Sequence, residues 1–215
     1  MASSLRVEWL GHMPYAEAHA RMLDFVEARA ADEVPDTLLL VEHDPVYTVG
    51  RHRDASANVL LPGDVPVVDV KRGGDVTFHG PGQLTAYPIV RLPEHRRDVM
   101  GWLHGLETVC TRVVARWGIP GSQDPRNTGV WVEGRKIAAI GIALRRWVSF
   151  HGFAINNTVD LGWFQRVNPC GMDSSLVTRI ADHAAPPALE TLRDAAAEEF
   201  GAWWAEWSAR PAETG

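Results

Sequence analysis

The sequence predicts a single α+β domain in which a central mixed sheet of hairpin-rich strands is covered by helices packed on one side. The length of 215 residues and the apolar content of 46% suit one domain with a substantial core, or at most two small domains. Helix-like and strand-like segments alternate without internal repeats or low-complexity linkers. A glycine-containing turn, Glu133-Gly134-Arg135, separates two apolar runs and predicts a hairpin. We therefore expect residues 1–215 to form one domain.

The first half of the chain predicts one helix and three strands. After Pro14, apolar residues at helical spacing predict an amphipathic helix to about Ala30; they are Tyr15, Ala18, Met22, Phe25 and Val26. The continuous apolar run at residues 38–41 is typical of a short buried strand. Strand-like runs at 67–70 and 83–90 flank a glycine-rich segment, which we expect to be a loop between two strands.

The second half predicts helices at both ends of a run of strands. Residues 99–117 form an amphipathic helix ended by Gly118, and its apolar face places Cys110 in the core. Strands are then expected over residues 129–132, 136–144 and 147–156. An irregular segment follows, and a final helix covers about residues 187–207.

The charge balance limits the classes of partner. A net charge of -6 and a pI near 5.8 argue against nucleic-acid or membrane-surface binding, which usually needs a basic excess. No apolar run is long enough to cross a membrane, and the first residues lack a secretory signal, so we expect a cytoplasmic protein. Short basic clusters are interpreted as solvated faces or as a docking patch for an acidic partner; they are Arg51-His52-Arg53, His95-Arg96-Arg97 and Arg145-Arg146.

The two cysteines have different surroundings in the sequence. Without an export signal a structural disulfide is not expected, and the absence of CxxC, HExxH or a His/Cys cluster at zinc spacing predicts no metal site. Cys110 lies at a core position of a helix and is interpreted as structural. Cys170 lies between Pro169 and Gly171 in the irregular segment RVNPCGMDSS. There it is either a nucleophile, with its pKa lowered by nearby N–H groups, or a packed loop cysteine.

A nucleophilic cysteine would need a partner that exchanges protons. His43, His79 and His151 are expected at strand ends, where sites tend to form. Lys136 opens the apolar run KIAAIGI and has two interpretations. It is either a strand-edge residue that reaches water, or a pocket residue whose ammonium holds a thiolate and exchanges protons with it.

Several motifs together resemble the octanoyltransferase (lipoyl/octanoyl transferase) family. The first is the run Arg72-Gly73-Gly74 with Thr77, His79, Gly82-Gln83 and Tyr87. The later segments GVWV with RKIAAIGI, HGFAIN and NPCG follow in the family's order. The resemblance covers about residues 37–180 and leaves the two ends of the chain unmatched.

The resemblance implies the catalytic fold of biotin and lipoate protein ligases and a specific reaction. Octanoyl, or lipoyl, would pass from the phosphopantetheine of acyl carrier protein to a lysine of a lipoyl domain, without a cofactor or ATP activation. The acceptors would be the lipoyl domains of 2-oxoacid dehydrogenase complexes and the glycine cleavage H protein. Cys170 would become an acyl-thioester, and Lys136 would lower its pKa and carry protons.

By the same resemblance, three segments would line the substrate pocket: Arg72, Gly73, Gly74, Asp75, Val76, Thr77, Phe78 and His79; Ala139, Ile140 and Gly141; Gly152, Phe153 and Ala154. Glycine lets a substrate approach the backbone closely, and loop N–H groups could donate to the thioester oxygen. His79 is expected to brace the loop by hydrogen bonds. The alternatives are an ATP-dependent lipoate or biotin protein ligase of the same fold, and a non-catalytic binder of acyl carrier or lipoyl domains.

Overall fold

The computed structural model of the chain describes residues 5–52, 55–168 and 173–209. The strands in this part are β1 (Arg6–Met13), β2 (Thr37–His43), β3 (Val46–Val49), β4 (Val67–Asp69), β5 (Val76–His79), β6 (Gln83–Ile89), β7 (Gly129–Val132), β8 (Arg135–Arg145) and β9 (Val148–Asn156). The helices are α1 (Tyr15–Ala30), α2 (Val99–Ala115) and α3 (Leu189–Ala209), and short 3-10 turns join several elements.

The strands form a large mixed sheet and a small one. The large sheet has the order β1-β2-β6-β9-β8-β7, in which only β1 and β2 are parallel and the other neighbours are antiparallel. The small sheet has the order β4-β3-β5. The hairpin between β7 and β8 forms as predicted, with Glu133 and Gly134 both at positive φ in its tight turn.

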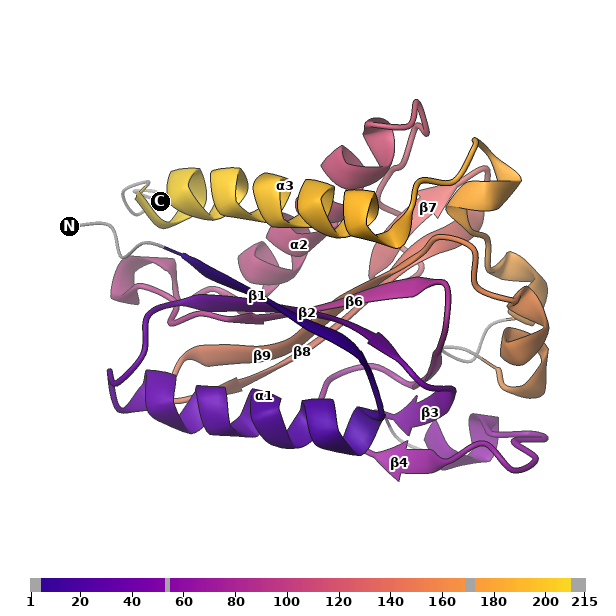
Figure 1. Ribbon diagram of the computed structural model, residues 1–215, viewed down its shortest axis with the longest axis horizontal. Helices are drawn as coiled ribbons and strands as arrows, with labels where there is room; N and C mark the ends of the chain where they lie inside the picture. The colour runs from indigo at the N-terminus through magenta and orange to yellow at the C-terminus, as the bar shows by residue number, and fades with distance from the viewer. Residues whose placement is uncertain (1–4, 53–54, 169–172, 210–215) are drawn as a thin grey trace.

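Helices cover both faces of the large sheet, and the prediction of helices on one side is wrong. In Figure 1, α1 lies on one side of the sheet and α2 and α3 lie on the other. Strand β2 shows why, because its successive side chains point to opposite faces. Leu38 and Leu40 pack in the cluster beneath α2 and α3, whereas Leu39 and Val41 pack beneath α1. A continuous apolar run therefore indicates a strand that is covered on both faces.

Aromatic side chains fill the core between the sheet, α2 and α3. The indole of Trp102 on α2 contacts the rings of Trp203, Trp204 and Trp207 on α3, with centroids 5.5–5.6 Å apart. The two helices approach closely at Gly105, where an added Cβ would lie 2.0 Å from the Trp203 ring. Any larger residue at this position would push α3 away from α2.

Two parts of the strand prediction need correction. Residues 76–79, expected within a loop, form β5 and pair with β3, so only residues 70–75 and 80–82 remain irregular. Strands β1 and β3 were not predicted. Strand β1 is a largely exposed edge strand in which Val7 and Trp9 are exposed, so it lacks the buried pattern that marks the inner strands.

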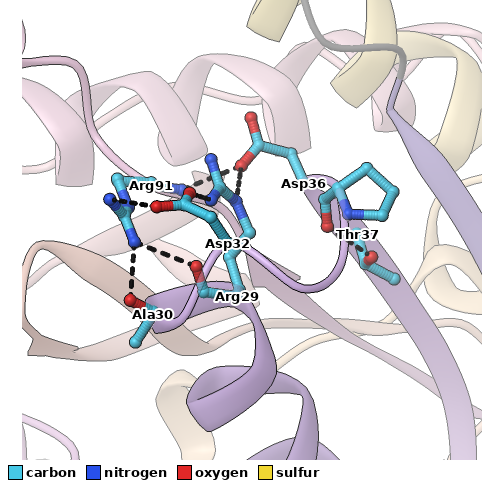
Figure 2. Close-up of polar contacts among 7 residues, drawn as sticks. Arg29, Ala30, Asp32, Asp36, Thr37 and Arg91 are labelled. Carbon is cyan, nitrogen blue, oxygen red and sulfur yellow. Dashed lines mark hydrogen bonds and ion pairs between the residues drawn. The ribbon is translucent and has the colours of Figure 1, made fainter.

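A polar cluster fixes the C-terminal end of α1 against the start of β2 (Figure 2). The buried Asp36 carboxylate accepts hydrogen bonds from Arg29 Nε at 2.7 Å and from the Arg91 backbone N–H at 3.0 Å. Arg91 Nη2 donates to the carbonyls of Arg29 and Ala30, at 3.0 and 2.8 Å, and its Nη1 pairs with Asp32. Because helix carbonyls at a C-terminus lack intrahelical partners, this guanidinium caps α1 and holds it over the sheet.

Candidate active site

A cavity of about 990 Å³ lies between α1, the glycine-rich segment and strands β8 and β9. These two strands line it with small residues, namely Ala139, Gly141, Ala143, Gly152 and Ala154, and with larger ones such as Ile140 and Phe150. Other walls come from α1, through Tyr15, His19 and Leu23, from α2, through Val99 and Leu103, and from residues 69–77. Small residues on the strands leave room that larger side chains would fill. The cavity has the size of a small-molecule site.

The structure brings together nearly all the residues that the resemblance assigns to substrate binding. Those that line the cavity are Arg72, Gly73, Gly74, Asp75, Val76, Thr77, His79, Ala139, Ile140, Gly141, Gly152, Phe153 and Ala154. Phe78 is not among the lining residues. Its ring packs between Tyr47 and Trp163, with both centroids 5.4 Å away, so it belongs to the core of the small sheet.

Hydrogen bonds fix the irregular residues 70–75 against both sheets. The N–H of Gly73 donates to the carbonyl of Ile142 on β8 at 2.8 Å, so it is already engaged and cannot serve a substrate oxygen unless that bond breaks. The buried Arg72 guanidinium donates through Nη2 to the Thr48 carbonyl and hydroxyl, at 2.8 and 2.9 Å. Asp75 accepts from its neighbour Val76 N–H and from Asn58 Nδ2, each at 2.7 Å. The segment is therefore held in place by its backbone and side chains together.

Lys136 lies in the wall of the cavity with only 6% of its surface exposed, which overturns the interpretation of a strand-edge residue reaching water. Its ammonium donates to Asn127 Oδ1 at 2.5 Å and to the Thr128 carbonyl at 2.9 Å. The Nζ also lies 5.1 Å from the centre of the Trp131 ring, a cation–π distance. Sequence reasoning missed Asn127 and Thr128, although they directly precede β7, the hairpin partner of the strand that carries Lys136.

A group of imidazole and phenol rings packs beneath α1, and all of its members except His43 line the cavity. Neighbouring rings have centroids 5.3–6.3 Å apart, and the members are Tyr15, His19, His43, His79, Tyr87 and His151. Burial lowers the pKa of His43 to about 4 and that of His79 and of His151 to about 3. Burial also raises the pKa of Tyr15, so these rings are uncharged near neutral pH.

His79 braces the glycine-rich segment, as predicted. Gln83 Nε2 donates to the Phe78 carbonyl and to Asn156 Oδ1, so Gln83 Oε1 is an acceptor and His79 Nδ1 donates to it at 2.7 Å. His43 ends β2 and His79 ends β5, as expected, but His151 lies within β9. Its φ of +55° is in the left-handed region, where a side chain leaves the regular alternation of a strand. Its ring stacks on His19 of α1.

The two cysteines stand differently in the structure. Cys110 lies on α2 and is fully buried in the core that this helix forms with α3 and the sheet. Burial raises its pKa well above the ordinary value, which confirms the structural interpretation. Cys170 lies outside the described residues. On its C-terminal side, Val177 pairs with Lys136, and the Thr178 N–H donates to the Lys136 carbonyl at 2.9 Å. Residues 177 and 178 thus lie beside the first residues of the strand that carries Lys136.

The basic clusters have different surroundings. Arg51 and Arg145 are exposed and border the cavity, and Arg145 pairs with Glu27 of α1. Arg96 and Arg97 stack on tryptophan rings, and Arg53 lies outside the described residues.

Within residues 5–52, 55–168 and 173–209, acidic, histidine and cysteine side chains form no group of three or more that could hold a metal ion. No helix in that part of the chain has the length and apolarity needed to cross a membrane.

Comparison with solved structures identifies the fold. A lipoate-protein ligase A bound with ATP superposes with a TM-score of 0.75 at 15% identity, over 95% of this chain and 86% of the ligase. The biotin protein ligase of Aquifex aeolicus gives a TM-score of 0.57 at 10% identity, over 96% and 71% of the two chains. At such low identity the likeness shows a shared fold alone, and it confirms the predicted biotin and lipoate ligase architecture.

Comparison of sequences identifies the family. Residues 14–201 match the lipoyl protein ligase A/B catalytic domain. The octanoyltransferase of Rubrobacter xylanophilus is 49% identical over 177 residues, which cover 79% of each chain. That of Syntrophotalea carbinolica is 43% identical over 183 residues, which cover 85% of this chain and 86% of the relative. The chain therefore contains a lipoyl protein ligase A/B catalytic domain and belongs to the octanoyltransferase family, so it is an acyltransferase of lipoate synthesis.

Proposed function

We propose that this enzyme takes octanoyl from the phosphopantetheine thioester of acyl carrier protein, holds it on Cys170 as an acyl-thioester, and delivers it to a lysine of a lipoyl domain. The acceptors are the lipoyl domains of 2-oxoacid dehydrogenase complexes and the glycine cleavage H protein. The reaction needs no cofactor, because transfer between thiols is nearly isoenergetic and transfer from thioester to amide runs downhill. The enzyme acts in the cytoplasm, where these carriers are made.

The buried position of the Lys136 ammonium in the cavity wall is the observation that carries this proposal. A lysine that is only 6% exposed must be stabilised by nearby acceptors, and Asn127 and Thr128 supply two oxygens that fix its position. A positive charge held in a partly desolvated cavity stabilises a thiolate more strongly than a charge in water does. The ammonium is also a proton donor that can exchange with a neighbouring sulfur.

The proposed reaction has two balanced halves. In the first, the Cys170 thiolate attacks the thioester carbonyl, a new C–S bond forms, and the pantetheine sulfur leaves and takes up a proton. In the second, the acceptor lysine amine attacks the Cys170 thioester, a C–N bond forms, and the cysteine sulfur leaves. We propose that the Lys136 ammonium gives the proton to the leaving pantetheine sulfur. The neutral lysine then takes up the proton that the acceptor amine loses, which restores the thiolate and the ammonium.

The shape of the cavity suits a slim acyl chain attached to a polar arm. The small side chains of Ala139, Ala143 and Ala154 let an alkyl chain lie close to the sheet, whereas Gly141 is covered by residues 72 and 73. We propose that residues 72–79, 139–141 and 152–154 bind this substrate, apart from Phe78, which packs away from the cavity. The neutral wall of imidazole and phenol rings adds apolar surface without an opposing charge.

Intact mass spectrometry after mixing the protein with octanoyl-acyl carrier protein tests the proposal. We expect one octanoyl adduct that hydroxylamine removes, as it removes thioesters. Cys170→Ala is expected to lose both the adduct and transfer to a lipoyl domain. Cys110→Ala is the matched control and is expected to keep both, because its thiol is fully buried. An adduct that persists in Cys170→Ala would assign the nucleophile to another residue.

A further inference from the structure

Glu107 places a carboxylate in the apolar core, on the face of α2 that packs against the sheet. Its surface is only 3% exposed, and neighbouring positions of this face are occupied by Leu106 and Cys110. A buried carboxylate is costly unless strong donors satisfy it. Glu107 Oε1 accepts from the Gly129 backbone N–H at 2.9 Å, and its Oε2 accepts from His104 Nδ1 at 2.9 Å. The proposed reaction makes no use of this residue.

The bond to Gly129 reaches the part of the backbone that surrounds the lysine side chain. Gly129 has a φ of +144°, and a Cβ added there would lie 2.5 Å from the Ala138 carbonyl and 3.1 Å from Lys136 Cε. The lysine side chain therefore passes beside Gly129 and leaves no room there for a Cβ. The two residues before it, Asn127 and Thr128, supply the oxygens that accept from Nζ.

We infer that Glu107 is a positioning residue for Lys136: it anchors Gly129 to α2 and so fixes the two oxygens that hold the lysine ammonium. The inference rests on the proposed role of Lys136. A carboxylate suits this task because a hydrogen bond to a charged acceptor is about twice as strong as a neutral one. Without the anchor, residues 127–129 are free to shift, and the ammonium shifts with them. A displacement of about 1 Å at a reacting group can cost roughly a hundredfold in rate.

Four substitutions separate positioning from simple packing. Glu107→Gln keeps an oxygen that can accept from Gly129, whereas Glu107→Leu removes the acceptor at similar volume. Cys110→Ala is the matched control, because it disturbs the same face of α2 but does not contact Gly129. Lys136→Ala reports the result of losing the ammonium itself. Each protein is assayed for octanoyl transfer and for the pH midpoint of Cys170 alkylation, with a thermal melt to verify folding.

We expect Glu107→Leu to lower kcat by roughly tenfold to a hundredfold, to leave KM for the octanoyl donor nearly unchanged, and to raise the alkylation midpoint. Glu107→Gln is expected to retain most of the activity and the wild-type midpoint. In the Lys136→Ala background, Glu107→Leu should have no further effect on the midpoint, because Glu107 acts through the lysine. If Glu107→Leu does not fold, Glu107→Asp, which draws the oxygen back by one carbon, is expected to show the same changes at smaller size.

Two results would overturn the inference and leave the proposed function intact. One is a Glu107→Leu protein with wild-type kcat and midpoint while Lys136→Ala is inactive. The other is an equal effect of Glu107→Leu with and without the lysine, which would mean that it acts elsewhere. A Lys136→Ala protein with wild-type alkylation and transfer would instead refute the proposed role of the lysine, and the inference with it.

Discussion

The buried histidines predict that this protein loses stability in mild acid. Burial lowers the pKa of His43 to about 4 and of His79 and His151 to about 3, whereas an unfolded histidine has a pKa of about 6.5. Between these values the unfolded chain binds protons that the folded chain does not. Stability from this source is therefore complete above about pH 6.5 and is lost as the pH falls toward the folded values.

The size of the effect follows from the same values. At about pH 5, each of these histidines has lost about 2 kcal/mol of its contribution, so the three together account for about 6 kcal/mol. Total stabilities of domains are about 5–15 kcal/mol, so this loss is a large part of the whole.

His12, which bridges Glu42 and Asp44, has a raised pKa, because hydrogen bonds to those carboxylates outweigh its desolvation. Its contribution is present below about pH 6.5 and lost above its folded pKa, but it is largely exposed and small.

Urea unfolding followed by tryptophan fluorescence, at several values between about pH 8 and pH 5, measures this loss. We expect the free energy of unfolding to fall by about 6 kcal/mol over the range. His43→Gln should remove about a third of the pH-dependent loss, whereas His95→Gln, at an exposed position, should leave it unchanged. A free energy that stays constant down to about pH 5 would refute the reasoning, because it would mean that the folded protein protonates these rings as readily as the unfolded chain does.

Three further sets of substitutions test the site and its surroundings. Lys136→Ala should raise the pH midpoint of Cys170 alkylation toward the ordinary thiol value of about 8.5, whereas Lys136→Arg should keep the alkylation but lose transfer. A wild-type pH profile in Lys136→Ala would assign the proton-carrying role to a histidine. Gly129→Ala, whose Cβ would lie 2.5 Å from a backbone oxygen at a φ of +144°, should cost roughly 1–3 kcal/mol of stability and should abolish transfer, and an unchanged melting temperature would contradict this. Charge reversal at Arg51 or Arg145 should raise KM for the acidic acyl carrier protein at low ionic strength and less so in salt; an unchanged KM would make these residues solvated surface.

Elements with buried, periodic patterns could be predicted from the sequence, and elements defined by tertiary pairing could not. The helix Tyr15–Ala30 begins and ends as expected, because its apolar residues recur every three or four positions. Strand Val76–His79 cannot be recognised in the sequence, because it is short, glycines precede and follow it, and its partner, β3, is distant in sequence. The uninterrupted apolar run Leu38–Val41 does indicate that both faces of the sheet are covered by other elements.

The candidate site shows the same division. The resemblance supplied the substrate-binding residues that lie within motifs, such as Arg72, and all of these but Phe78 line the cavity. It did not supply His19 or Asn127, because these reach the cavity only through the packing of α1 and through the start of β7. The left-handed backbone of His151 also has no sequence signal, since non-glycine residues seldom adopt it.

Lys136 is in contact with the cavity and is also connected, through Gly129, to the side of the sheet that faces α2. The small lining residues and the uncharged rings, which contact the substrate in the proposed reaction, lie mainly on the side that faces α1, although Val99 and Leu103 of α2 also line the cavity. The side that faces α2 contributes Glu107, which reaches the lysine only through the backbone of Gly129. Because one side binds and the other positions, substitutions on them should change different kinetic parameters. Ala143→Val, which adds volume to a small lining residue, should mainly raise KM for the octanoyl donor, whereas Glu107→Leu should mainly lower kcat. Equal changes in both parameters for both variants would show that the two sides are not separate in function.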